Sequence, residues 1–101
     1  MLLAVMVRRL KEGVSYEQFK DAWTPEHGFG REVRVLNAVN VDDPRELVSV
    51  GLMPGATKEK LPAFLSQVAA SEASRHAKME TVIDGFVLRG IYEVVDDVDL
   101  S

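Results

Sequence analysis

The residues best suited to chemistry lie close together, in the segment from Ser15 to Gly28. This segment holds the only Trp of the chain, Trp23, and one of its two His residues, His27, which follows Glu26. A neutral imidazole can accept a proton near pH 7, so His27 is the candidate catalytic acid–base residue. Trp23 offers a flat apolar wall for an aromatic ligand and an indole N–H that could donate to a ligand oxygen.

Each of these residues also has a purely structural interpretation. Trp23 lies at helical spacing from Phe19, so it can be a core residue that touches no ligand. His27 follows Pro25, which ends or kinks the preceding helix, and it can simply close the loop there. Glu26 is expected in solvent because charged residues are rarely buried.

Polar side chains within apolar strands form a second group of candidates, since a buried polar group needs a partner. Asn37 shares a face with valines in its strand, and Tyr92 is expected on the same face as Phe86 in the last strand. Either Asn37 or Tyr92 could anchor a substrate carbonyl. The structural alternative is pairing among polar groups, such as Arg89 with Glu93 across a dimer.

Length and composition limit the classes of function. The 101 residues form one domain, 1–101, with an acidic tail at 96–101 that can fray. The net charge of −4 argues against a nucleic-acid partner, which normally meets a basic face. The chain has no Cys, so thiolate metal sites are excluded, and no metal or cofactor is predicted. The N-terminal apolar run is too short for a membrane span, and a cytoplasmic location is expected.

Hydrophobic periodicity predicts four strands and two main helices. The expected strands are 2–10, 31–41, 46–53 and 86–95, with turns at 42–44 and 84–85. The first helix runs from a Ser15 cap to Pro25. The second begins near Leu61 and is followed by a separate short helix over 71–82. The order β-α-β-β-α-β predicts an α+β, ferredoxin-like fold, with a four-stranded antiparallel sheet and both helices on one face.

Both faces of the predicted sheet are apolar, although two helices can cover only one of them. In the first strand, for example, Leu3, Val5 and Val7 alternate with Leu2, Ala4 and Met6. A monomer rarely exposes so large an apolar surface. The sequence therefore predicts a homodimer joined through the sheet face, the simplest cover being a second copy. The alternative is that loops and the tail fold over this face.

Two segments resemble known families within the dimeric α+β barrel superfamily. The stretch 9–19 (R-L-K-E-G-V-S-Y-E-Q-F), followed by Trp23 and His27, resembles the EthD-like branch. The stretch 71–76 (S-E-A-S-R-H) resembles the corresponding part of antibiotic-biosynthesis monooxygenases. The resemblance implies a dimeric α+β barrel with a small pocket between sheet and helices. Family members include cofactor-independent oxygenases, haem-degrading enzymes, lactone isomerases and polyketide cyclases.

These observations lead to three functional hypotheses. The first is a small cofactor-independent enzyme acting on an aromatic or polyketide-like molecule, by acid–base or oxygenation chemistry. The second is a non-catalytic small-molecule binding or sensing module, and the third is a structural homodimer. The resemblance would also permit a haem ligand at His76. Haem-degrading relatives, however, pair it with an Asn on the first strand and a Trp on the second helix, and this chain has neither.

Overall fold

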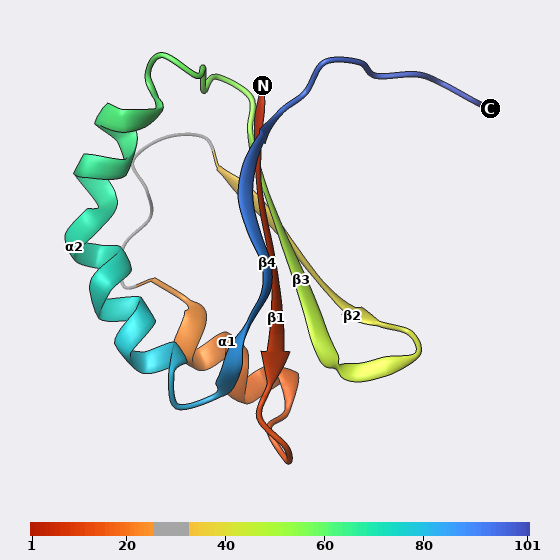
Figure 1. Ribbon diagram of the computed structural model, residues 1–101, viewed down its shortest axis with the longest axis vertical. Helices are drawn as coiled ribbons and strands as arrows, with labels where there is room; N and C mark the ends of the chain where they lie inside the picture. The colour runs from red at the N-terminus through yellow and green to blue at the C-terminus, as the bar shows by residue number, and fades with distance from the viewer. Residues whose placement is uncertain (26–32) are drawn as a thin grey trace.

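A four-stranded antiparallel sheet with two helices on one side forms the framework of the molecule (Figure 1). The computed structural model describes residues 1–25 and 33–101. The elements in chain order are β1 (Leu2–Leu10), α1 (Tyr16–Trp23), β2 (Arg34–Asn40), β3 (Asp43–Met53), α2 (Leu61–Met79) and β4 (Ile83–Glu93). The strand order in the sheet is β2-β3-β1-β4. This arrangement confirms the predicted ferredoxin-like α+β fold.

Helix α1 begins and ends at the residues that the sequence indicates. Ser15 Oγ accepts from the Gln18 amide at 3.2 Å, and Gln18 Oε1 accepts from the Ser15 amide at 2.8 Å, which completes a capping box. The helix ends at Thr24, because Pro25 cannot donate to the turn before it. Phe19 is fully buried, and burial of a side chain of this size stabilises the fold by about 1.5–3 kcal/mol.

Helix α2 is one continuous helix of 19 residues, so the predicted break near Ser71 is wrong. Alanines at 69, 70 and 73 surround Ser71, and alanine is the best helix former. Ser71 is exposed, so it needs no buried partner. The continuity places Glu72, Arg75 and His76 on the same helix as Phe64.

The side of the sheet that carries α1 and α2, here called the helix face, holds two separate apolar clusters. The first contains the buried residues Leu10, Phe19, Leu47, Met79 and Ile83. The second contains Leu2, Met53 and Phe64. Because Leu2 and Leu10 are the two ends of β1, the clusters lie at opposite ends of the sheet and leave its middle to other residues.

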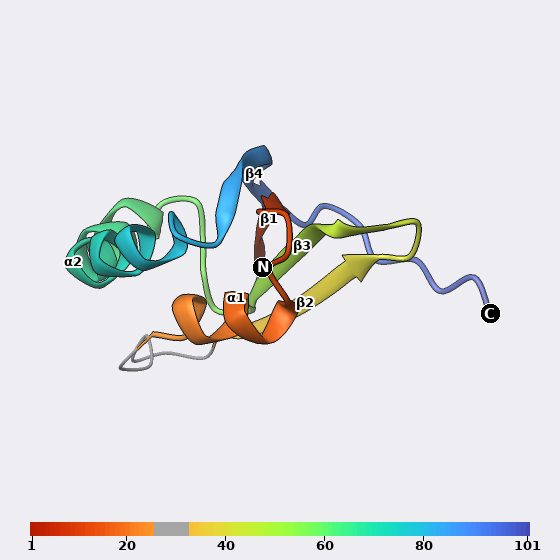
Figure 2. The same cartoon turned by 90° about the horizontal axis from the view of Figure 1, so that it is seen from below.

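The opposite side of the sheet, here called the open face, is covered by neither α1 nor α2 (Figure 2). Cross-strand register places the following residues on it: Leu3, Val5, Val7, Leu36, Val48, Val50, Leu52, Leu88 and Tyr92. Leu36, Leu88 and Tyr92 keep nearly half of their surface exposed. The open face is therefore apolar, as the alternation in the sequence predicts.

Strand β4 contains a bulge that reverses one prediction. Val7 pairs with Leu88, but the next residue, Arg8, pairs with Phe86, so Val87 is the extra residue. A bulge of this kind turns the following side chain to the other side of the sheet. Phe86 consequently lies on the helix face beside Arg8, whereas simple alternation places it with Leu88 and Tyr92.

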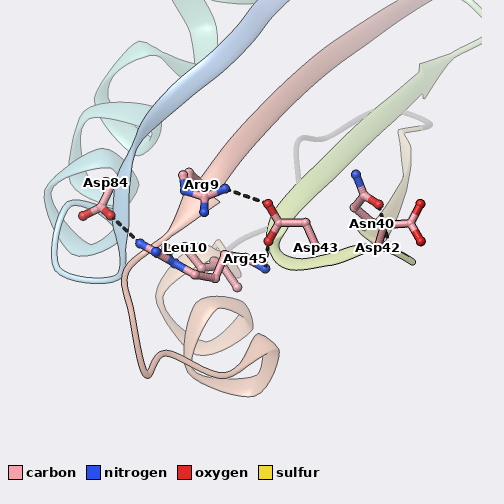
Figure 3. A network of polar contacts seen from close by, with 7 residues as sticks. All are labelled: Arg9, Leu10, Asn40, Asp42, Asp43, Arg45 and Asp84. Carbon is pink, nitrogen blue, oxygen red and sulfur yellow. Dashed lines mark hydrogen bonds and ion pairs between the residues drawn. The ribbon is translucent and has the colours of Figure 1, made fainter.

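Polar contacts join three strands at the end of the sheet near the β2–β3 turn (Figure 3). Arg9 of β1 forms an ion pair with Asp43 of β3 at 2.8 Å. Arg45 of β3 donates to the Leu10 carbonyl at 3.0 Å and forms an ion pair with Asp84 of β4 at 2.9 Å. These groups are partly exposed, so the contacts fix strand register more than they stabilise the fold.

The chain leaves the sheet after a hydrogen bond from the Val94 amide to the Met1 carbonyl at 3.0 Å. Residues 94–101 contain no helix or strand, and their ribbon extends away from the sheet (Figure 1). Val95, Val98 and Leu100 are exposed along it. Within the described ranges, no helix combines the length and apolar character needed to span a membrane.

Candidate functional site

A cavity of about 520 Å³ lies on the helix face, between the two apolar clusters. The strands form its floor with small side chains, namely Ala4, Ser49 and Gly51, together with Met6. Gly51 pairs with Ala4 across the β1–β3 ladder, so two of the smallest residues meet at the same point. Larger residues there would fill the space, and the choice of small residues therefore creates the cavity.

The walls of the cavity are mainly apolar. Helix α1 contributes Trp23, the region of β2 contributes Val33 and Val35, and α2 contributes Phe64 and Val68. The Trp23 ring stacks on the buried Phe19 ring, with centroids 6.2 Å apart. Trp23 thus packs against the core and also forms part of the cavity wall.

A charged group on α2 lines the same cavity. Glu72, Arg75 and His76 all border it, at positions that helical geometry places on one side. Arg75 Nη1 lies 2.5 Å from one carboxylate oxygen of Glu72, and His76 Nε2 lies 3.7 Å from the other. Glu72 can therefore stabilise a protonated imidazole at His76 while it remains bound to Arg75.

Arg75 is buried and lies over the Trp23 ring, with its guanidinium carbon 5.4 Å from the ring centroid. Burial lowers the pKa of Arg75, and the charge and hydrogen bond of Glu72 oppose that effect. The contact joins the charged group on α2 to the aromatic wall from α1. A planar ligand in the cavity would meet both.

A chain of hydrogen bonds runs across the floor of the cavity from β1 to α1. Arg8 Nη1 donates to Ser49 Oγ at 3.0 Å, and Ser49 Oγ donates to Asn37 Oδ1 at 2.6 Å. Asn37 Nδ2 donates to the Tyr16 hydroxyl at 3.2 Å. Ser49 borders the cavity, so this chain fixes the direction of the one floor hydroxyl. Asn37 acts there through Ser49, as a positioning residue.

Arg8, at one end of this series of hydrogen bonds, has only 1% of its surface exposed. Burial lowers the pKa of Arg8 to about 10, and the nearby positive charge of Arg75 contributes in the same direction. The guanidinium carbon lies 5.5 Å from the Phe19 ring centroid and 5.3 Å from that of Phe86. The bulge in β4 provides the second of these rings.

The predicted site residues fall in different places. Trp23 lines the cavity, and Asn37 lies behind its floor, bonded to Ser49. Tyr92 pairs with Leu3 on the open face and does not border the cavity, because alternation along β4 turns it away from the helices. As a cavity residue Tyr92 is therefore misplaced by the prediction. His27 lies outside the described residues.

Sequence reasoning missed Arg8 as a site residue, although the sequence contains the signal. In β1 the even positions Leu2, Ala4, Met6 and Leu10 face the helices, and Arg8 interrupts them. A charged residue at a core-facing position of an apolar strand is unusual and requires a partner. Its environment could not be foreseen, because Phe86 reaches it only through the bulge.

Over residues 1–25 and 33–101, no three His, Asp or Glu side chains converge in a way that could hold a metal ion. His76 borders the cavity, and within the described residues its ion-pair contact is with Glu72. The described side chains therefore offer acid–base and hydrogen-bonding groups.

Comparison with known proteins identifies a structural relative. The sequence matches no family model, and no curated protein matches it significantly. Among solved structures, the chain is similar to a crystal structure named "putative Antibiotic biosynthesis monooxygenase" from Chloroflexus aurantiacus J-10-fl. The TM-score is 0.68 at 13% identity, over 99% of this chain and 98% of that one. The likeness covers nearly the whole of both chains and supports the ferredoxin-like α+β fold.

Proposed function

We propose that the protein is a small cofactor-independent enzyme that acts on an aromatic or polyketide-like molecule bound in the cavity. The observation that carries this proposal is one cavity bordered by both the Trp23 ring and the His76–Glu72 pair. Its volume of about 520 Å³ lies within the range of sites for small organic ligands. The similarity of fold to a protein named as an antibiotic biosynthesis monooxygenase is compatible with an enzyme of this kind.

The chemistry proposed is removal of a proton from a phenol, an enol or an activated C–H group of the ligand. The His76 imidazole accepts the proton, and Glu72, whose carboxylate lies 3.7 Å from Nε2, stabilises the imidazolium that forms. The resulting ligand anion can rearrange, or it can react with dioxygen as the oxidant. Trp23 holds the ring system in place. His27, the candidate from the sequence, is the second imidazole to be tested in this role.

Turnover of a tricyclic C–H acid such as anthrone tests the proposal. His76→Gln and His27→Gln are matched variants, since each removes one of the two imidazoles of the chain. We expect His76→Gln to lower kcat by about 100-fold or more, the usual contribution of a general base, while anthrone still quenches Trp23 fluorescence. A comparable loss only in His27→Gln would move the role to that residue. Binding without turnover in the wild-type protein would favour a binding module instead.

We also propose that two copies pair through the open face. Val5, Val50 and Leu88 lie on neighbouring strands there, and monomers rarely leave so wide an apolar surface in water. A symmetric contact between two copies buries this surface on both. Light scattering behind a sizing column should give a mass of about twice 11.2 kDa. A single 11.2 kDa species at micromolar concentration would refute it. A cytoplasmic location stays a prediction from the sequence.

A further inference from the structure

Arg8 is a buried cation whose hydrogen-bond partners among the described residues are all neutral. Its Nη1 donates to Ser49 Oγ at 3.0 Å and its Nη2 to Met6 Sδ at 3.2 Å. Its Nε is buried without a hydrogen-bond partner. In the part of the chain that the structure describes, no carboxylate lies within ion-pair distance of this guanidinium. A buried charge usually has an ion-pair partner or a full set of strong acceptors, and residues 1–25 and 33–101 give Arg8 neither.

The weaker hydrogen bond of the Arg8 guanidinium is accepted by a residue that lines the cavity. Met6 and Ser49, which accept the two Nη bonds, both border the cavity, so Arg8 lies directly behind its floor. Ser49 is held by its own bond to Asn37 and is a firm partner. Met6 is not, because a thioether sulfur is a weak acceptor on a flexible, unbranched side chain. Met6 thus lines the cavity and also accepts one of the guanidinium's hydrogen bonds.

We infer that the ligand of the cavity carries an oxyanion, either a carboxylate or an ionised phenol or enol, which displaces the Met6 sulfur and accepts from Arg8 Nη2. This inference rests on the proposed function and names its substrate class. An anionic oxygen forms a stronger, shorter bond to a guanidinium than sulfur can. The aromatic part of the same ligand would lie along the apolar walls from α1 and α2.

The other charged residues at the cavity also favour an anionic ligand. Arg75 and Arg89 border it and add positive charge, and Glu72 is the carboxylate among the described lining residues. Glu72 is bound to Arg75, and although its charge partly opposes the effect of burial on Arg8, it forms no ion pair with that guanidinium. Arg89 also contacts the Phe86 ring, an aromatic neighbour of Arg8, with its guanidinium carbon 5.2 Å from the ring centroid. A neutral ligand would leave this excess of positive charge unbalanced.

A pair of probes that differ only in charge tests the inference. Anthraquinone-2-carboxylate and anthraquinone-2-carboxamide share one tricyclic ring system, and the Kd of each can be measured through quenching of Trp23 fluorescence. We expect the wild-type protein to bind the carboxylate about 10- to 100-fold more tightly, the range for a hydrogen bond to a charged group. Arg8→Met should abolish this preference. Arg9→Met is the matched control, because Arg9 is the next residue of β1 and points to the other side.

A second variant keeps the test decisive if Arg8→Met does not fold. Met6→Leu preserves side-chain volume and removes the sulfur acceptor, so Arg8 Nη2 loses its partner in the free protein. The carboxylate should then bind at least as tightly as in the wild-type protein and raise the Tm by more. If the preference vanishes in Met6→Leu or persists in Arg8→Met, the route through Met6 to Arg8 is overturned.

The wild-type protein alone separates the two proposals. Equal Kd values for the carboxylate and the carboxamide overturn the oxyanion inference and leave the aromatic cavity of the proposed function standing. Failure of both probes to bind overturns both proposals. Tight binding of the carboxylate with loss of the preference in Arg8→Met supports both.

Discussion

Replacement of Arg8 by Met should stabilise the protein in the absence of ligand. Within the described residues the guanidinium is buried against neutral hydrogen-bond partners, so folding desolvates a charge that the more distant Glu72 offsets only in part. Met retains a flexible chain that can occupy much of the same space between the Phe19 and Phe86 rings. An arginine kept for folding would give the reverse result.

The lowered pKa sets the size of the effect. The pKa of Arg8 falls from its ordinary value to about 10, and at about 1.4 kcal/mol per pKa unit burial, together with the smaller net effect of the neighbouring charges, disfavours the charged form by about 3 kcal/mol. This cost is fully present well below pH 10 and disappears as the pH rises through the folded pKa towards that of the unfolded chain, so measurements at pH 7 include all of it. Loss of the bond to Ser49 and of the ring contacts offsets about 2 kcal/mol. The net gain expected is about 1 kcal/mol.

Urea unfolding at pH 7 measures the difference in the free energy of unfolding between Arg8→Met and the wild-type protein. In thermal unfolding the Tm should rise by about 4–8 °C for a domain of this size. Arg9→Met is the control: Arg9 is partly exposed and paired with Asp43, so its replacement should give a small loss. A loss of more than about 1 kcal/mol in Arg8→Met would refute the reasoning. It would show that the neutral partners satisfy the guanidinium, and the need for a ligand oxyanion would disappear.

Three further predictions follow from other parts of the molecule. Val50→Asp at the centre of the open face should halve the mass in light scattering, whereas Val41→Asp in the exposed β2–β3 turn should not; equal masses would exclude this face as the interface. Arg9 lowers the pKa of Asp43, so Asp43 adds stability above its unfolded pKa of 3.8 that is lost as the pH falls through the folded value. Asp43→Asn should flatten urea stability below pH 5, and an unchanged pH profile would argue against the ion pair. Gly51→Ala should fold, since its Cβ meets Ala4 at an ordinary 3.5 Å, while Gly51→Leu should fill the cavity and prevent quenching of Trp23 by aromatic probes. Continued quenching would place the ligand elsewhere.

The order of elements could be predicted because each depends on local signals. The Ser15 cap, the Pro25 stop and the alternation in β1 act over a few residues, and all three are confirmed. The predicted turn at 42–44 is less accurate, since β3 begins at Asp43 and contains Pro44. Pro44 is tolerated there because the register shifts next to it, from Val39–Leu47 to Asn40–Asp43, and it pairs with no residue of β2.

The site could be predicted only in part, because it depends on contacts between distant segments. Trp23 was identified by its residue type, and helical spacing places it on the side of α1 that meets the sheet. Tyr92 was misplaced, since no local signal indicates which face of β4 meets the helices. The predicted turn at 84–85 is instead a second irregularity of β4, where Gly85 adopts a φ of +149° that suits glycine.

The bulge at Val87 links the fold to the chemistry of the cavity. Without the extra residue, Phe86 would lie on the open face with Leu88, and Arg8 would lose one of its two aromatic neighbours. The ring offers a weakly attractive surface to a cation, so it makes burial of Arg8 tolerable without neutralising its charge. A protein carboxylate in place of the Phe86 ring would form an ion pair with Arg8, and a ligand oxyanion would then gain little from binding there. An acidic protein with a net charge of −4 can therefore keep a locally positive cavity, because the charge of a site depends on its nearest partners.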